Sequence, residues 1–199
     1  MTLQLICYPK GNLVLFLDGL HTPAADIFFK LYTHIGDGLT SIAVAVALFL
    51  LVTMRWGLLT LLTFALSGGI SQLLKTVVFG PTPRPHRYFE GLNLLHPVEG
   101  VKIAYIYSFP SGHTISTFAL FSMLAFLIPK NQGITGLLFC LAALGGISRI
   151  YLGQHFTEDV LAGMLIGTLC SMVLYYWVEE KKGFMASPKL DKPLLKLKK

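Results

Sequence analysis

The sequence predicts an all-α integral membrane protein, in which five transmembrane helices form a bundle and a further N-terminal helix precedes them. Hydrophobic residues make up 54% of the 199 residues and charged residues only 13%, whereas soluble domains carry about a quarter charged residues. Five stretches contain no charged side chain: residues 38–54, 56–74, 114–129, 131–148 and 160–178. Each is slightly shorter than the roughly 20 residues that cross a bilayer, and backbone groups in lipid must bond internally, so each is expected to be a helix. A soluble all-helical core is the disfavoured alternative, because it would not need five such runs in so short a chain.

Residues 1–37 differ from the rest, because charged or titratable side chains interrupt every apolar run: Asp18, His21, Asp26, Lys30, His34 and Asp37. Within residues 24–35 the apolar side chains recur at the spacing of one helix face. This pattern predicts an amphipathic helix at the membrane interface, with a sixth crossing as the alternative. The chain is therefore divided into an N-terminal segment (1–37), a transmembrane domain (38–178) and a basic tail (179–199).

Lysine and arginine predict the orientation of the bundle. Arg55 and Lys130 lie in very short connections, and the tail holds seven lysines against three acidic residues. Since positive charge favours the cytoplasmic side, both connections and the tail are expected inside. The long connection 76–112 and the turn 153–158 are then external. Within the fifth stretch, Gly163 and Gly167 are expected to let another helix of the same chain pack closely.

Polar residues collect at the external ends of the predicted helices, where charges are usually functional or paired. These candidate site residues are Lys75, Arg84, Ser111, Gly112, His113, Arg149, His155 and Asp159. Three of them are cations, which together can neutralise a phosphoryl group during transfer. The site is therefore expected to bind an anionic, phosphate-bearing substrate.

The spacing of these residues indicates separate roles. His155 and Asp159 are four apart, so on a helix they share a face, and the carboxylate can hold one imidazole nitrogen while the other acts as a nucleophile. Ser111 can cap the following helix, whose free N–H groups form an anion site. His113 then lies where a general acid for the leaving group is needed.

Two segments of the sequence resemble signatures of the type 2 phosphatidic acid phosphatase superfamily. Pro110-Ser111-Gly112-His113 resembles the second signature, and Ser148-Arg149 followed by His155 and Asp159 resembles the third. The first signature of that family is a lysine, six residues and Arg-Pro, whereas here eight residues separate Lys75 from Arg84-Pro85. The resemblance covers residues 38–178.

The resemblance implies a metal-independent membrane phosphatase, without any cofactor, that hydrolyses a lipid phosphate or pyrophosphate. It implies six transmembrane helices, as in many bacterial members. It makes His155 the nucleophile that forms a phosphohistidine, Asp159 its orienting partner and His113 the general acid. It assigns phosphate binding to Lys75, Arg84, Ser111, Gly112 and Arg149. The expected partners are the bilayer and its lipid phosphate, with no nucleic acid, and the expected location is the inner membrane with the site facing the periplasm.

Three alternatives remain open from the sequence. A phosphotransferase would use the same residues and pass the phosphoryl group to a second lipid. A transporter would need polar residues deep in several spans, and only residues 67–72 resemble that. A noncatalytic phosphate-binding protein would not require the complete set of catalytic residues. The apolar and aromatic loop 86–109 is expected to lie on the lipid surface and to influence substrate choice.

Overall fold

Helices account for nearly all of the regular structure. The computed structural model describes residues 10–128, 131–181 and 187–195. Its helices are α2 (Asn12–Asp18), α3 (Pro23–Tyr32), η1 (Thr33–Gly36), α4 (Gly38–Leu51), α5 (Met54–Leu73), η2 (Leu74–Val78), α6 (Pro85–Tyr88), α7 (Gly112–Leu127), α8 (Gln132–Tyr151), α9 (Thr157–Lys181) and η4 (Pro188–Asp191). Within these ranges no β-strand forms, and one isolated bridge joins Pro83 to Ile106. The predicted all-α class is confirmed.

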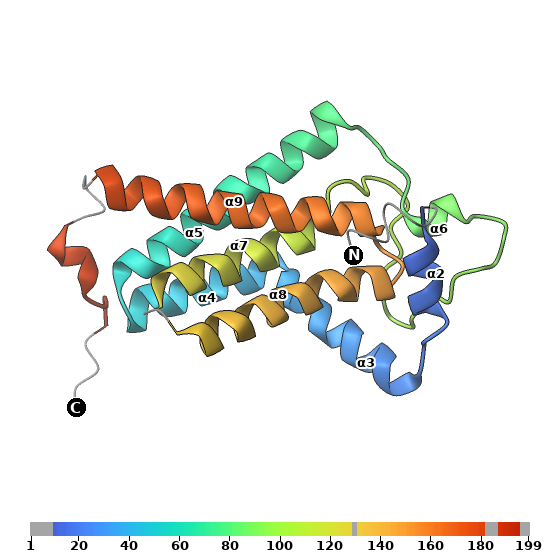
Figure 1. Cartoon of the computed structure of the whole chain (residues 1–199), viewed down its shortest axis with the longest axis horizontal. Helices are drawn as coiled ribbons and strands as arrows, with labels where there is room; N and C mark the ends of the chain where they lie inside the picture. Colours follow the sequence, from blue (N-terminus) through green and yellow to red (C-terminus); the bar gives the residue numbers. More distant parts are fainter. Residues whose placement is uncertain (1–9, 129–130, 182–186, 196–199) are drawn as a thin grey trace.

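Helix α7 lies at the centre of the bundle and packs against α5, α8 and α9 (Figure 1). Its side chains are apolar or small on every face, as expected of a helix surrounded by others. Ile115, Phe118 and Met123 are all buried. The five uncharged stretches of the sequence correspond to α4, α5, α7, α8 and α9, so the positions of the helices follow from the sequence.

Close packing of α9 on α7 depends on two glycines. A Cβ atom on Gly163 would lie 2.9 Å from the carbonyl oxygen of Ser111, and one on Gly167 would lie 2.5 Å from that of Ile115. Neither position therefore accommodates a side chain without a shift of α7. The interpretation of this glycine pair as a contact within one chain is confirmed.

Fewer single helices than the five predicted are long and apolar enough to cross a membrane. Three helical segments, Met54–Val78, Gln132–Tyr151 and Thr157–Val178, are long and apolar enough to span a bilayer. The pair Pro23–Gly36 and Gly38–Leu51 meets the same test together, with a bend of 58° at the break. The described helices thus supply three spans, or four if the bent pair is one. The reason is length, since α4 has 14 residues and α7 has 16, or about 21 and 24 Å at 1.5 Å per residue.

The N-terminal helices pack on α7 and α8 near the end of the bundle where α8 terminates. On α3, the Tyr32 hydroxyl donates to the carbonyl of Leu141 over 2.8 Å, and Asp26 accepts a 2.6 Å hydrogen bond from Tyr151. The opposite face of α3 presents Ile27 and Leu31, which are 61% and 63% exposed. An apolar face directed away from the protein is what a helix bordered by lipid requires.

The described part of the C-terminal tail lies at the opposite end of the bundle, against the connection between α4 and α5 (Figure 1). Arg55 forms a 2.9 Å ion pair with Asp191, and the backbone N–H of Leu195 donates to the carbonyl of Leu50 over 3.0 Å. Arg55 and this part of the tail therefore share one end, as predicted. Lys130, the other cation used to orient the bundle, lies outside the described residues.

Candidate active site

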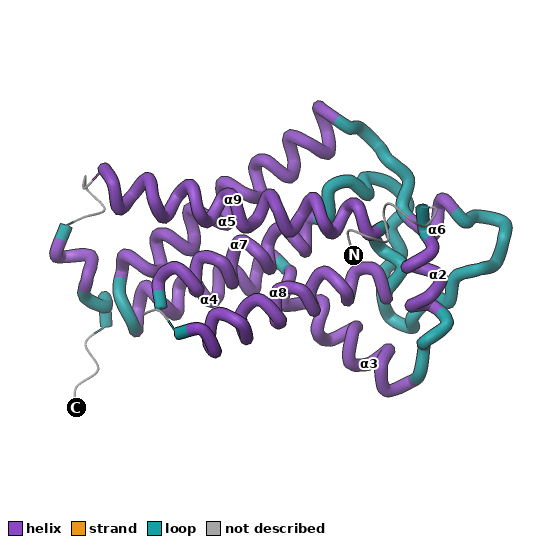
Figure 2. Tube along the Cα trace, in the orientation of Figure 1, coloured by secondary structure: helices purple, strands orange, loops and turns teal. Residues whose placement is uncertain are grey.

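The candidate residues converge at the end of the bundle where α5 and α8 terminate and α7 and α9 begin. Loops gather at this end, including the long connection from η2 to α7 that carries α6 (Figure 2). Because consecutive bundle helices run in opposite directions, residues from the end of one and the start of the next meet there (Figure 1). The contacts described below place all eight candidates of the sequence in this region.

His155 lies in the turn before α9 and not on the helix itself, because α9 begins at Thr157. The expected helical pairing of His155 with Asp159 is therefore wrong in its local geometry. The contact is nevertheless present, with 3.4 Å between Nδ1 of His155 and Oδ2 of Asp159, and both side chains are 1% exposed. Asp159 Oδ2 also accepts hydrogen bonds from the backbone N–H of Phe156, at 2.9 Å, and from the hydroxyl of Ser108. The carboxylate thus holds the turn in which His155 lies.

The surroundings of His155 favour the neutral form of its imidazole. Burial lowers its pKa well below the ordinary value, and the positive charges of Arg84, Arg149 and Lys75 lower that pKa further. Burial disfavours the charged form of a histidine, and nearby cations act in the same direction. A neutral ring nitrogen carries the lone pair that a nucleophile needs.

The start of α7 has the predicted cap. Ser111 is the N-cap residue, and its side chain accepts a hydrogen bond from the backbone N–H of Thr114. Its own N–H donates over 3.0 Å to the carbonyl of Asp159, which ties the start of α7 to the start of α9. Gly112 follows without a side chain, so backbone N–H groups at the helix start are accessible to an anion.

Lys75 reaches this helix start despite its unusual distance from Arg84. Its Nζ atom lies 3.5 Å from the position that a Cβ atom on Gly112 would occupy. The segment Leu74–Val78 forms a π-helical turn, and the N–H of Thr82 donates to the carbonyl of Gly80 in a tight turn after it. A π-turn accommodates additional residues in a helix. The two residues beyond the family spacing are thus absorbed between Lys75 and Arg84.

Arg149 is buried and has an N–H group without a hydrogen-bond partner among the described residues. Its side chain is only 7% exposed, and Nη1 donates to the hydroxyl of Thr33 over 2.7 Å. Its Nε has no hydrogen-bond partner among the described residues. A buried guanidinium with an unpaired N–H is costly unless it binds an anion, and its planar fork suits a phosphate.

Arg84 is held by hydrogen bonds to two separate parts of the chain, residues 106–107 and Gln154. Its Nε donates to the carbonyl of Ile106 over 2.9 Å and its Nη2 to that of Tyr107 over 3.4 Å. Its Nη1 donates to the side-chain oxygen of Gln154 over 3.2 Å. Tyr107 has a φ of 59°, in the left-handed region that bulky residues rarely adopt. Such strained residues concentrate at functional sites, and here the strained carbonyl faces a candidate phosphate ligand.

His113 has a carboxylate partner that the sequence analysis did not assign to the site. Nε2 of His113 lies 2.8 Å from Oδ1 of Asp37, at the start of α4. Thr33, Ser108 and Gln154 were missed as well. Asp37 was visible in the sequence as a charged residue directly before an apolar stretch, which is the one available indication. The other three are uncharged polar residues, and nothing in their spacing distinguishes them.

Within residues 10–128, 131–181 and 187–195, no group of three or more histidine, cysteine or acidic side chains is arranged to hold a metal ion. The positive charge of the site comes instead from Lys75, Arg84 and Arg149. These cations offer no lone pairs as ligands, so the donor set suits an anion rather than a cation.

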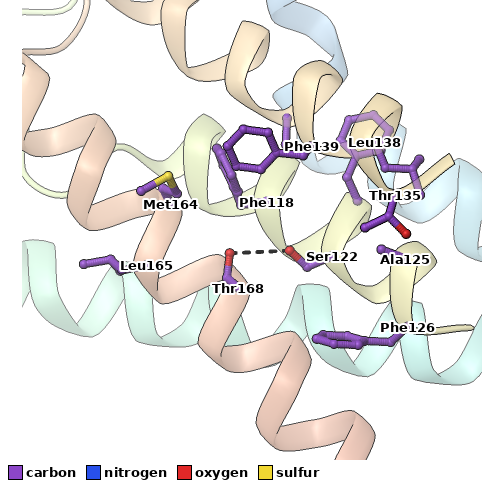
Figure 3. A pocket seen from close by; sticks show the side chains of 12 residues that line it. Phe118, Ser122, Ala125, Phe126, Thr135, Leu138, Phe139, Met164, Leu165 and Thr168 are labelled. Atoms are coloured by element: carbon purple, nitrogen blue, oxygen red, sulfur yellow. Dashed lines mark hydrogen bonds between the residues drawn. The ribbon is translucent and has the colours of Figure 1, made fainter. Parts of the chain in front are cut away.

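A hollow of about 390 Å³ lies deeper in the bundle, between α7, α8 and α9 (Figure 3). Apolar side chains form its wall, and the hydroxyl of Ser122 donates to that of Thr168 over 3.4 Å. Towards the polar site, a Cβ atom on Gly145 would lie 2.7 Å from the methyl group of Thr117. Close packing at that level lies between the hollow and the polar site, and the polar groups in the lining of the hollow are uncharged hydroxyls.

Comparison with known proteins gives consistent matches. A model described as the PAP2 superfamily matches residues 56–182. Lipid A 1-phosphatase of Rhizobium etli is 30% identical over 162 residues, which are 72% of this chain and 67% of that protein. The crystal structure of LpxE from Aquifex aeolicus has a TM-score of 0.73 at 28% identity, covering 84% of this chain and 94% of that one.

A second solved structure, a transmembrane PAP2-type phosphatidylglycerolphosphate phosphatase from Bacillus subtilis, has a TM-score of 0.70 at 26% identity. It covers 87% of this chain and 86% of that one. The sequence match covers less than half the length of two Bacillus proteins, 36% of bacitracin transport permease protein BcrC from Bacillus licheniformis and 42% of phosphatidylglycerophosphatase B from Bacillus subtilis.

Proposed function

The chain belongs to the PAP2 superfamily, and from this premise we propose that it is a membrane phosphatase that hydrolyses a lipid phosphate or pyrophosphate through a phosphohistidine on His155. The observation that carries the proposal is the environment of His155. Its imidazole is buried, burial and three nearby cations lower its pKa, and Nδ1 lies 3.4 Å from the carboxylate of Asp159. That combination makes a nucleophile and places it beside the charge that would bind a phosphate.

In the first half of the proposed reaction, Asp159 holds Nδ1 of His155 and Nε2 attacks phosphorus. The P–N bond forms as the P–O bond to the leaving group breaks, and the departing oxygen takes a proton from His113. In the second half, water attacks the phosphohistidine and gives its proton to His113. Inorganic phosphate leaves, and both histidines return to their starting protonation states.

Charge stabilisation comes from the residues around the nucleophile. Arg149, Arg84 and Lys75 come from three different elements and face the same imidazole. The start of α7, with Ser111 as its cap and Gly112 as its first residue, adds backbone N–H groups. Donors fixed in advance around a transferring phosphoryl group stabilise its transition state without reorganisation. Because these cations supply the positive charge, we propose that the reaction needs no metal ion.

A lipid substrate is supported by the apolar surroundings of the site. Val77, Val78 and Phe79 follow Lys75 and are 72%, 58% and 48% exposed, and Ile106 beside Arg84 is 47% exposed. Phe79 also meets Phe109 edge to face, with ring centroids 4.7 Å apart. Large apolar side chains next to a cluster of cations suit a molecule with a hydrocarbon chain and a phosphate head group.

A transport path through the bundle has less support. Deep in α5, the hydroxyls of Thr63 and Ser67 donate to the carbonyls of Leu59 and Phe64 in the same helix. These two hydroxyl groups are satisfied by their own helix and serve helix packing. Charged residues in the spans are confined to the ends of α5, α8 and α9.

We place the site on the external face of the inner membrane. The support is the position of Arg55 and of the described part of the tail at the end of the bundle opposite to the site. Positively charged segments favour the cytoplasmic side. Five crossings, with α4 and α7 among them, agree with this arrangement, and the short helices would then cross where neighbouring helices or bilayer thinning accommodate them.

The test is a phosphate-release assay with purified protein and four lipids: undecaprenyl pyrophosphate, phosphatidylglycerol phosphate, phosphatidic acid and lipid A. Release from at least one lipid in excess EDTA is expected, as is inhibition by vanadate, which mimics five-coordinate phosphorus. Acid-quenched reactions with ³²P-labelled lipid should show label on the protein and none on His155→Ala. Transfer of label to a second lipid without inorganic phosphate would identify a phosphotransferase. Activity that is lost on chelation and restored by magnesium would contradict the metal-free mechanism.

A further inference from the structure

Asp37 occupies the break between η1 and α4, where the chain bends by 58°. Its two carboxylate oxygens contact two imidazoles, with Oδ1 2.8 Å from Nε2 of His113 and Oδ2 2.7 Å from Nδ1 of His34. The preceding residue is equally close to the site, because a Cβ atom on Gly36 would lie 2.9 Å from Cβ of His113. Two consecutive residues of the N-terminal region thus fix the side chain of His113.

The site therefore contains two histidine–carboxylate pairs with different surroundings. His155 and Asp159 are both 1% exposed, whereas the side chains of His113 and Asp37 are 32% and 39% exposed. A nucleophile has to be neutral, but a general acid has to carry a proton before it can give one away. The less buried pair has a carboxylate that can stabilise the protonated ring of His113, against the burial of that ring and the charge of Arg149, which both disfavour it.

Two cations, Arg149 and Lys75, lie near His113. The charged and titratable groups that face it are Asp37 from the break before α4, Arg149 from α8 and His155 from the turn before α9. Lys75 approaches the adjacent Gly112, and His34 faces Asp37 from η1. Among these groups Asp37 is the only carboxylate. A negative charge in contact with the ring is what stabilises a protonated imidazole among cations.

We propose that Asp37, held by His34, is the positioning residue that orients His113 and stabilises its protonated form for donation to the leaving group. The inference rests on the proposed phosphatase function. Because Nε2 stays bonded to Asp37, Nδ1 is the nitrogen that exchanges the proton. As the P–O bond breaks, the leaving oxygen keeps the electron pair and takes the proton from Nδ1, and His113 becomes neutral. In the second half of the reaction, the attacking water returns a proton to the same nitrogen.

The experiment compares wild type with Asp37→Asn on two substrates, phosphatidic acid in mixed micelles and p-nitrophenyl phosphate. An alkoxide needs protonation to leave, whereas nitrophenolate does not. We therefore expect Asp37→Asn to lower kcat/KM on phosphatidic acid roughly 10- to 100-fold, a part of the 10²–10⁴ that general acids contribute. On the aryl phosphate we expect a loss of only a few fold. The basic limb of the pH–rate profile should move to lower pH, because the protonated ring loses its negative partner.

Asp26→Asn is the matched control. Asp26 is a second carboxylate of the N-terminal region, paired with His21 at 2.6 Å on α3 and not in contact with His113. Asp26→Asn should change kcat/KM equally on both substrates and leave the basic limb of the pH–rate profile in place. His34→Gln retains the carboxylate of Asp37 but removes the second imidazole that contacts it. This variant should lose less kcat/KM than Asp37→Asn, and its loss should again be larger on phosphatidic acid than on p-nitrophenyl phosphate. This variant also tests the proposal if Asp37→Asn does not fold.

Equal losses on both substrates, with an unmoved basic limb, would reduce Asp37 to a structural role and overturn the inference. Such a result would leave the proposed function intact, because wild type would still release phosphate. Conversely, wild-type protein that neither releases phosphate nor forms a phosphoenzyme would refute the proposed function, and the inference with it.

Discussion

Arg149 at the end of α8 donates a hydrogen bond of 2.7 Å to the hydroxyl of Thr33, which lies 116 residues earlier in the chain. This bond orients the guanidinium and leaves its Nε for a ligand. Thr33→Val preserves the shape of the side chain but removes the acceptor. A hydrogen bond to a charged group contributes about 1.5–3 kcal/mol, so we expect KM for the lipid substrate to rise roughly 10-fold or more. Steady-state kinetics with Thr33→Ser as the control check this, and an unchanged KM in Thr33→Val would contradict it.

The two histidines should respond differently to removal. His155→Ala should abolish both phosphoenzyme formation and turnover, because it removes the proposed nucleophile. His113→Ala should retain comparatively more activity on an activated aryl phosphate than on a lipid monophosphate, since a general acid contributes roughly 10²–10⁴-fold only where the leaving group needs a proton. Acid-quenched trapping and rates on both substrates measure this. Label on His155→Ala but not on His113→Ala would show that the roles are reversed.

Asp159→Asn should keep the fold and slow turnover. An amide oxygen can still accept the N–H of Phe156, which the carboxylate accepts at 2.9 Å. The amide cannot supply the negative charge that fixes the tautomer and orientation of His155. We expect phosphoenzyme to form more slowly than in wild type, while the thermal unfolding temperature in detergent changes little. Unfolded protein, or wild-type kinetics, would each argue against this role.

The pH dependence of the reaction should reflect the lowered pKa of His155. Since the neutral ring attacks phosphorus, activity should persist below the ordinary histidine pKa of about 6.5, and the acid limb of kcat/KM should lie on the acid side of that value. Arg84 is one of the cations that lower the pKa of His155. Arg84→Gln should therefore raise this pKa and shift the acid limb to higher pH, in addition to weakening substrate binding.

Arg87→Gln is the control for this shift. Arg87 is an exposed neighbour of Arg84 that pairs with Glu90 at 2.9 Å. Its removal changes the net charge equally but should leave the acid limb where it is. If both arginine variants move the limb alike, the shift would reflect the overall charge of the loop and not the environment of His155.

Orientation in the membrane can be tested with single cysteines. In a variant lacking Cys7, Cys140 and Cys170, Lys189→Cys lies in the tail and Leu92→Cys in the loop 86–109. Because Lys-rich segments remain cytoplasmic, an impermeant thiol reagent should label Leu92→Cys in intact cells and Lys189→Cys only after lysis. The opposite pattern would place the active site inside the cell.

The sequence predicted the helices, and it singled out the eight candidate residues that converge at one end of the bundle, because both predictions depend on local patterns. Uncharged stretches predict helices, and the cap at Ser111 and the pairing of His155 with Asp159 join residues within five positions of one another. The geometry of that pair was wrong, because Asp159 binds the N–H of Phe156 and α9 begins only at Thr157. The four-residue spacing predicted that the two side chains are in contact, but it did not predict the backbone conformation that brings them together.

Contacts between distant segments could not be predicted in this way. Asp37 meets His113, and Thr33 meets Arg149, only because the N-terminal helices pack against α7 and α8. The distance from Lys75 to Arg84 looked anomalous for a related reason, since a π-helical turn changes how far eight residues reach. In each case the packing of distant segments determines where the side chain lies, and no periodicity of the sequence predicts that packing.

The region matched by the family model begins at residue 56, so the partners of two key side chains lie upstream of it. Asp37 and Thr33 can change in evolution without altering any signature residue, and each change would alter the surroundings of the proposed proton donor or of the proposed phosphate ligand. Relatives with identical signatures can therefore differ in reaction rate and in preferred leaving group. The N-terminal region is the place to search for the origin of such differences.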